Sequence, residues 1–292
     1  MDKTLAFYML RHVSGVGNAL LLQLLNQTIH ETDSDWTLPF IMSHLAVSEN
    51  KRVNIEIQLG AMMEHLTFWE EKKARDPFIL LTDHHYPLPL SQIYNPPAML
   101  FYRGNLALLK QDALAVIGSR QPVADSYRIV QSFIPALVPH FVIVSGLAKG
   151  IDAYAHVQTL KSKGSAIAVV GNGLDYYYPS ENRKLQERIA QEHLLLSEYP
   201  SGTEPRPYYF PQRNRIIAGL SNGVCVFQAG RRSGTFITAS IALEEGRGVF
   251  AVPGSALSPH FAGCHRLIQL GAKLVFEPNH IIEEKWLYHY HR

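Results

Sequence analysis

A series of short apolar runs from residue 114 onward constrains the fold more than any other feature. The runs cover residues 114–117, 141–144, 166–170, 194–197, 224–228 and 249–252, and stretches of helical pattern separate them. Near-continuous Val, Ile, Leu and Ala residues are typical of strands that are buried on both faces. Because such strands alternate with helices, they favour a doubly wound, mostly parallel sheet. We therefore predict a Rossmann-like α/β domain over residues 111–292.

The first 75 residues have a different, helical pattern. Apolar residues recur at helical spacing in residues 19–25 and 55–69. Between the first apolar segments, the sequence Val-Ser-Gly-Val-Gly-Asn at residues 13–18 places two glycines in a short turn. This turn is similar to the hairpin of helix-hairpin-helix and SAM-like modules, which hold DNA phosphates through free amides. The alternative is a tight turn between two helices that binds nothing.

A proline-rich segment at residues 76–110 separates these two regions. Its prolines exclude long helices. They are Pro77, Pro87, Pro89, Pro96 and Pro97. We interpret the segment as a connector that carries short strands at residues 78–81 and 98–102, and thus predict domains at 1–75 and 111–292.

Composition limits the compartment and the class of protein. A length of 292 residues with 47% hydrophobic content fits one large α/β domain and a small companion. The two cysteines imply no disulfide framework, which favours a reducing compartment. The first ten residues lack the pattern of a signal peptide, and no apolar run is long enough to span a membrane. We expect a cytoplasmic protein.

The net charge of +2 says little about partners, but the charge distribution is uneven. Residues 205–243 contain no Asp or Glu. The same segment contains Arg206, Arg213, Arg215, Arg231 and Arg232. If the fold gathers these arginines on one face, they form a local anion site that the total charge hides.

Glycine-rich turns follow four of the predicted strands. The turns begin at Gly118-Ser-Arg, at Ser145-Gly-Leu-Ala-Lys-Gly, at Gly171-Asn-Gly and at Ser233-Gly-Thr. Ligands of open α/β sheets bind beyond the carboxyl ends of the strands. Glycine lets the backbone approach a phosphate, and the start of a helix supplies free amides and a positive dipole end. The four turns together predict an anion-binding groove.

The familiar nucleotide motifs are absent from these turns. A dinucleotide site needs Gly-x-Gly-x-x-Gly after the first strand, and Gly118-Ser-Arg-Gln-Pro lacks it. No glycine-lysine-serine or glycine-lysine-threonine triplet of a P-loop follows a strand. His156 and the Cys264-His265 pair have no partners at the spacing of metal ligands. We therefore predict neither a cofactor nor a metal site.

Aromatic residues accompany the predicted groove. Tyr176, Tyr177 and Tyr178 follow the third turn, and residues 208–210 (Tyr-Tyr-Phe) precede Arg213. Basic groups interleaved with aromatic rings suit single-stranded nucleic acid, whose phosphates bind the cations and whose bases stack on the rings. The alternative is that these rings only cover the core between the helices and the sheet.

The motifs resemble those of the DprA/Smf family in order and spacing. Besides the four turns, the resemblance includes Tyr178-Pro179, the run Phe-Pro-Gln-Arg-Asn-Arg-Ile-Ile at residues 210–217, and Val-Pro-Gly at residues 252–254. It covers roughly residues 77–274, and residues 1–75 are similar to the family's SAM-like domain only in type. It implies a non-catalytic homodimer that binds single-stranded DNA and loads a RecA-type recombinase onto incoming DNA during natural transformation.

The resemblance also assigns residues to the DNA site. Together with the basic, aromatic and hydroxyl residues beside the turns, the predicted DNA-binding residues are Gly118, Ser119, Arg120, Ser145, Gly146, Lys149, Gly150, Gly171, Gly173, Tyr178, Arg183, Lys184, Arg213, Asn214, Arg215, Ser233, Gly234 and Thr235. Family members often carry a basic residue after the Tyr-Pro pair, where this chain has Ser180. Arg183 or Lys184 is expected to replace it.

The family's surface for dimerisation and for the recombinase lies at the C-terminal edge of the domain. There, an apolar face on a short helix precedes residues 273–276, which we predict to form an edge strand open to pairing with another chain. The expected interface residues are His265, Ile268, Gln269 and Leu274. The alternative is that they close the domain's own core.

Two other functions fit the same scaffold. Nucleotide phosphoribohydrolases of the lysine-decarboxylase-like group carry Pro-Gly-Gly-x-Gly-Thr-x-x-Glu, but this chain has Thr238 at the place of the catalytic glutamate. We therefore expect no enzyme activity. The second alternative is a module that senses a mononucleotide bound in the groove.

Overall fold

The computed structural model describes residues 1–31, 35–231 and 233–284, so Arg232 and residues 285–292 lie outside the described chain. The chain forms two compact units. The N-terminal unit comprises residues 1–84 and 97–101, and the sheet unit comprises residues 85–96 and the described chain from Tyr102 onward. The segment predicted as a connector is thus shared between the two units.

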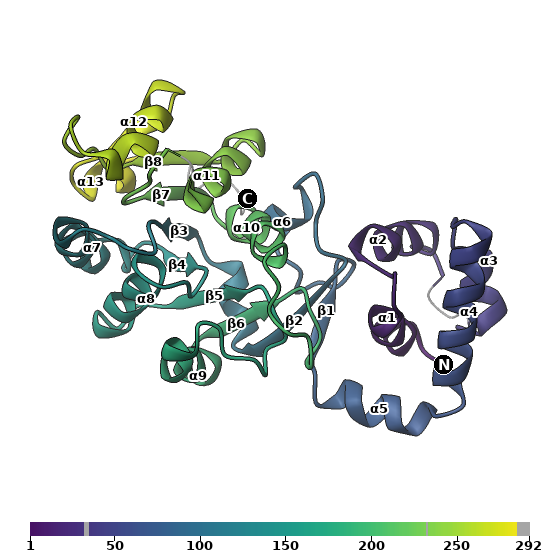
Figure 1. Ribbon diagram of the computed structural model, residues 1–292. Helices are drawn as coiled ribbons and strands as arrows, with labels where there is room; N and C mark the ends of the chain where they lie inside the picture. Colours follow the sequence, from purple (N-terminus) through teal and green to yellow (C-terminus); the bar gives the residue numbers. More distant parts are fainter. Residues whose placement is uncertain (32–34, 232, 285–292) are drawn as a thin grey trace. The chain divides into compact units, whose positions relative to one another are not determined.

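The N-terminal unit is helical, as the sequence predicts (Figure 1). Its helices are α1 (Lys3–His12), α2 (Asn18–Gln27), α3 (Leu38–Ser43), α4 (Glu49–Met63) and α5 (Leu66–Ala74). The stretch expected to be helical over residues 55–69 is divided at Glu64 and His65, where α4 ends and α5 begins. Helix α1 is the centre of the unit, because its residues 5–10 are all buried. The unit ends on an antiparallel pair, in which β1 (Phe78–Leu80) lies beside the start of β2 (Met99–Gly104).

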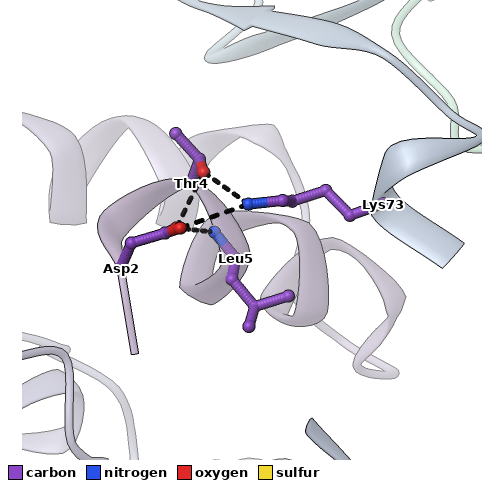
Figure 2. A network of polar contacts seen from close by, with 4 residues as sticks. All are labelled: Asp2, Thr4, Leu5 and Lys73. Atoms are coloured by element: carbon purple, nitrogen blue, oxygen red, sulfur yellow. Dashed lines mark hydrogen bonds and ion pairs between the residues drawn. The ribbon is translucent and has the colours of Figure 1, made fainter. Parts of the chain in front are cut away.

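A polar network joins the first and last helices of this unit (Figure 2). The Asp2 carboxylate caps α1, since its Oδ1 accepts hydrogen bonds from the Leu5 amide at 2.6 Å and from the Thr4 hydroxyl at 2.7 Å. The Lys73 ammonium on α5 lies 2.8 Å from Thr4 Oγ1 and 3.3 Å from Asp2 Oδ2. The cap of one helix therefore also anchors the other.

The sheet unit is built on parallel strands in the order β6-β5-β4-β3-β7-β8-β9, with β2 beside β6. The strands are β3 (Ala113–Ile117), β4 (Val142–Ser145), β5 (Ala166–Val170), β6 (Leu194–Ser197), β7 (Gly223–Val226), β8 (Gly248–Ala251) and β9 (Lys273–Leu274). Each of the six predicted runs forms a strand, and the bounds differ by at most two residues. The mostly parallel α/β fold predicted from the sequence is confirmed.

Helices cover both faces of this sheet. They are α6 (Leu88–Ser91), α7 (Ala124–Leu137), α8 (Ile151–Lys161), α9 (Arg183–Glu192), α10 (Tyr209–Leu220), α11 (Gly234–Glu244), α12 (Ala262–Gln269) and α13 (Asn279–Ile282). Helices α7 and α8 lie on one face, and α10 and α11 lie on the other (Figure 1). Right-handed crossovers explain the change of face, because the chain passes from β3 outward to β6 and then returns to β7 beside β3. The strand order therefore reverses between β3 and β7.

The proline-rich residues 85–96 pack onto the sheet unit. Leu90 and Ile93 are buried against Gly219 of α10, where an added Cβ would lie 2.8 Å from the nearest atom of Leu90. The buried Arg247 guanidinium donates a hydrogen bond to the Pro89 carbonyl at 2.6 Å. This segment thus completes the sheet unit. Among the described residues, none of the helices combines the length and apolarity that crossing a membrane requires.

Candidate nucleic-acid interface

A groove lies at the point where the strand order reverses, beyond the carboxyl ends of β3 and β7. It consists of three hollows of 380, 60 and 340 Å³, each of which is lined by both Arg120 and Phe210. We call this set the strand-end groove. The predicted residues that line it are Gly118, Ser119, Arg120, Gly146, Lys149, Tyr178, Arg213, Asn214, Ser233, Gly234 and Thr235. The position is where open α/β sheets bind ligands.

One face of α10 forms a wall of the groove. Phe210, Arg213, Asn214 and Ile217 all line its largest hollow, and their spacing of three and four residues places them on one helical face. Arg213 and Asn214 are among the DNA-binding residues predicted from the sequence, whereas Phe210 is predicted only as one of the aromatic residues beside the groove. The helical spacing to Arg213 and Asn214 is the signal that adds Phe210 to the site residues.

A cation and two stacked rings lie side by side in the groove. The Phe210 ring stacks on Tyr178, with 5.1 Å between the centroids and 28° between the planes. The guanidinium carbon of Arg120 lies 5.9 Å from the centroid of the Phe210 ring. Arg120 is exposed, and so is Tyr178. This arrangement offers a phosphate partner next to an aromatic surface on which a base can stack.

The N-terminus of α11 contributes the second feature suited to anions. Ser233 caps the helix, and its Oγ accepts a hydrogen bond from the Phe236 amide. Gly234 is exposed, and a Cβ added there would have no atom within 4 Å. The Thr235 hydroxyl donates a hydrogen bond to the Gly118 carbonyl at 3.0 Å. The positive end of an eleven-residue helix therefore opens into the groove beside Gly234.

The remaining predicted cations differ in their surroundings. The Lys149 ammonium lies 2.7 Å from the Glu181 carboxylate, and because both side chains are half exposed this pair is weak and separable. Arg183 lies over the Tyr177 ring at 4.8 Å and pairs with Glu187 at 2.8 Å. Arg183 and Lys184 are both exposed but line none of the three hollows. That Arg183 or Lys184 replaces the basic residue expected at the position of Ser180 stays a prediction.

Two predicted contacts, Ser145 and Arg213, are buried, and a third, Arg215, has only 13% of its side chain exposed. The Ser145 hydroxyl donates to the Val116 carbonyl at 2.6 Å. Arg213 is 4% exposed, and its guanidinium donates to backbone carbonyls beneath the groove. Arg215 points away from the Arg213 face of α10 and pairs with the buried Glu198 at 2.6 Å. All three side chains hydrogen-bond to acceptors within the protein, and sequence alone does not indicate which residues such acceptors satisfy. Their contact with DNA stays a prediction.

Several predicted glycines serve close packing. A Cβ on Gly118 would lie 2.6 Å from an Ile151 carbon, and one on Gly150, whose φ is +80°, would strike the Ser119 carbonyl. Gly171 packs against Phe210, and the Gly173 amide already donates to the Thr203 carbonyl at 2.8 Å. The amide of Gly173 is therefore not available to a phosphate in this conformation.

Asp152 contributes a buried carboxylate to the largest hollow. Its Oδ2 accepts a hydrogen bond from the Gly146 amide at 3.2 Å, whereas the nearby Lys149 pairs with Glu181. Burial raises the pKa of Asp152 to about 6, and the charge of Arg213 and the amides of Gly118 and Gly146 oppose this rise.

The residues predicted at the C-terminal interface lie on and beside the outermost strand. Leu274 on β9 is 41% exposed, and Gln269 is exposed at the end of α12. Ile268 is partly buried, whereas its neighbour Leu267 belongs to the core. The His265 ring is half-buried and lies 3.0 Å from the Gly254 carbonyl. The edge beside β9 thus carries an apolar, exposed side chain.

Comparisons with known proteins agree on one family. The model of the family described as DNA recombination-mediator protein A matches residues 77–285. DNA processing protein DprA of Streptococcus pneumoniae is 50% identical over 208 residues, which cover 71% of this chain and 74% of that protein. The corresponding protein of Bacillus subtilis is 45% identical over 208 residues and 70% of each chain.

Solved structures give the same result. The X-ray structure of DNA processing protein A from S. pneumoniae has a TM-score of 0.90 at 40% identity, and the match covers 97% of this chain and 99% of that chain. A structure of DNA processing protein A from Helicobacter pylori, described as giving insight into that protein's single-stranded DNA binding mode, has a TM-score of 0.64 at 30% identity. That match covers 70% of this chain and 94% of the other.

Proposed function

This chain belongs to the family of DNA recombination-mediator protein A, and from that premise we propose that it binds single-stranded DNA in the strand-end groove. The relatives are DNA-processing proteins, and the H. pylori relative binds single-stranded DNA. We propose that the residues lining the strand-end groove of this chain bind the same ligand.

The observation that carries this proposal is the cluster of Arg120, Phe210 and Tyr178 in the groove. Single strands are held by cations that follow the phosphates and by rings that stack with unpaired bases. Duplex DNA hides its bases in the stack, so the two rings would have no partner there. The open start of α11 at Gly234 supplies a further phosphate position.

We propose that the protein acts by binding and not by catalysis. In the phosphoribohydrolase alternative, Thr238 stands where the catalytic glutamate belongs, and its hydroxyl lies 3.2 Å from the Gly234 carbonyl. Asp152 is the carboxylate that lines the hollow, and it accepts a hydrogen bond from the Gly146 amide. Incubation with nucleoside monophosphates is expected to release no base, and release would restore the enzyme hypothesis.

Membership of the family also supports a finer proposal. We propose that the protein acts in the cytoplasm as a homodimer joined at the β9 edge, and that it loads a RecA-type recombinase onto incoming single strands during natural transformation. The exposed side chains of Leu274 on β9 and Gln269 at the end of α12 support this edge as the contact surface.

A mobility shift that compares single-stranded with duplex DNA of equal length tests the function. We expect tighter binding of the single strand and an affinity that falls steeply with added salt, because binding releases counterions from the phosphates. Adding a RecA-type recombinase should accelerate filament formation on the bound strand. Binding of AMP without binding of an oligothymidine would favour the nucleotide-sensing alternative instead.

A further inference from the structure

We propose that Asp152 and Arg213 are positioning residues, which hold the loop between β4 and α8 in the shape that binds DNA and do not contact DNA themselves. This inference rests on the proposed function and assigns a role to two groups that line the groove. We call residues 146–150 the β4–α8 loop. It follows β4 and leads to the first turn of α8.

Asp152 and Arg213 hydrogen-bond to the two backbone groups of the same residue, Gly146. The Gly146 amide donates to Asp152 Oδ2 at 3.2 Å, and the Gly146 carbonyl accepts from Arg213 Nη1 at 2.6 Å. The same Nη1 donates to the Val169 carbonyl on β5. Asp152 is 7% exposed and Arg213 is 4% exposed. Each charge is thus placed beneath the loop, where it can orient the backbone but has little contact with solvent.

The next residue of the loop shows why such support is needed. Leu147 is buried and has a φ of +53°, which is the left-handed region that a leucine rarely adopts. Its carbonyl accepts a hydrogen bond from Asn182 Nδ2 at 2.8 Å. A backbone conformation of this kind persists only where its surroundings fix it. Side chains from α8, α10 and the 3₁₀ turn Ser180–Asn182 therefore fix two successive loop residues.

The Arg213 guanidinium fills the space behind the β4–α8 loop. A Cβ added to Gly146 would strike the Arg213 guanidinium, so only glycine lets the two lie so close. On its other side the loop contributes Gly146, Ala148 and the exposed Lys149 to the groove. Displacing the guanidinium would therefore shift the loop atoms that face DNA.

Replacing Asp152 tests the proposal, because the two possible roles of its carboxylate predict opposite changes in DNA affinity. If the carboxylate acted only as a negative charge near the DNA, Asp152→Ala would strengthen binding of an oligothymidine by removing repulsion. If it positions the loop, Asp152→Ala weakens binding, and we expect a loss of about tenfold from the missing hydrogen bond. Asp152→Asn keeps an acceptor for the Gly146 amide and should bind more tightly than Asp152→Ala. Asp125→Ala is the matched control, because it removes the same charge from an exposed site on α7.

The salt dependence tests Arg213. Removing a phosphate contact lowers the slope of log affinity against log salt by about 1. For Arg213→Met we expect weaker binding with an unchanged slope. A slope that falls by about 1 would make Arg213 a direct contact and overturn the proposal. Gly146→Ala alters no charge and displaces the guanidinium, so it should also weaken binding at unchanged slope, and it serves if the Asp152 variants do not fold.

Hydrogen exchange of the DNA-free protein separates this inference from the proposed function. In Asp152→Ala and Gly146→Ala, the amides of residues 146–150 should exchange about tenfold faster than in the unaltered chain, while amides of α7 keep their rates. Unchanged exchange in the loop would overturn the positioning role, whether or not the protein binds DNA. Failure of the unaltered chain to bind an oligothymidine would instead refute the proposed function.

Discussion

The guanidinium carbon of Arg120 lies 5.9 Å from the centroid of the Phe210 ring, so the loop after β3 and the start of α10 meet across the groove. These residues lie far apart in the sequence, and each lines all three hollows. Their proximity places a solvent-facing cation beside an aromatic face. Both can serve one nucleotide of a single strand, the cation through its phosphate and the ring through its base.

Arg120→Ala is expected to weaken binding of an oligothymidine and to reduce the salt slope by about 1, because one phosphate contact is lost. Arg120 is exposed, so the thermal stability should stay within about 0.5 kcal/mol of the unaltered chain. The measurement is fluorescence anisotropy over a range of salt concentrations. Arg128→Ala on α7 is the control, since that arginine is also exposed and lines none of the three hollows. Equal affinities for the two variants would show that the groove is misplaced.

Tyr178→Ala tests stacking separately from charge. Loss of one stacked base costs about 1–3 kcal/mol, so the affinity should fall by about 5- to 150-fold while the salt slope keeps its value. Tyr178 is 46% exposed, and the substitution should leave the fold intact. Tyr94→Ala provides the control, because Tyr94 is almost fully exposed and lies outside the three hollows. If Tyr178→Ala bound normally, the ring would serve only to cover Phe210.

Most of the sheet could be predicted from the sequence because its strands are buried on both faces. A strand such as β3, with the sequence Ala-Leu-Ala-Val-Ile, carries no polar residue, and its glycine turn marks where it ends. The ends of the strands then gave the position of the groove. These conclusions depend only on local sequence.

The roles of individual groove residues depend on partners that are distant in the sequence. Arg213 and Arg215 are two residues apart on α10, so they face different directions, and each is satisfied by a different acceptor, the Gly146 carbonyl and the Glu198 carboxylate. The Gly173 amide is occupied by the Thr203 carbonyl. The sequence around these residues does not reveal such partners. It therefore cannot separate residues that bond within the protein from residues that face the groove.

His12 should make the stability of the N-terminal unit dependent on pH. Burial lowers the pKa of His12 to about 4, the nearby charges of Lys72 and Arg11 add to this, and the hydrogen bond to the Tyr8 carbonyl opposes it. In the unfolded chain the pKa lies near 6.5, so between pH 6.5 and 4 the unfolded state binds more protons. Stability is therefore complete above pH 6.5 and decreases as the pH falls toward 4, by about 3 kcal/mol at most.

Urea unfolding at several pH values, followed by tryptophan fluorescence, measures this effect, because Trp36 and Trp69 lie in the N-terminal unit. His12→Gln keeps a hydrogen-bond donor but does not titrate, so it should lose less stability than the unaltered chain on acidification. Parallel curves for the two proteins would assign the pH dependence to other groups.

Asp2→Ala should destabilise the N-terminal unit more than Lys73→Ala does. The first change removes the cap of α1 and should cost about 1 kcal/mol. The second removes an ion pair whose carboxylate is 64% exposed, which contributes about 0.2–1 kcal/mol. Urea unfolding of both variants gives the order of the two losses. The reverse order would mean that the link to α5 matters more than the cap.

Leu274→Glu should convert the proposed homodimer into a monomer. Leu274 is 41% exposed on β9, the last strand in the sheet order of the described residues, so a charge there would have to be buried when two edges pair. His265 is a poorer target, because its ring also lies 3.0 Å from the Gly254 carbonyl and supports that loop. Size-exclusion chromatography with light scattering gives the mass, and Leu257→Glu, at a leucine 95% exposed in a loop, is the control. A dimer that survives Leu274→Glu but dissociates in Leu257→Glu would move the interface to that loop.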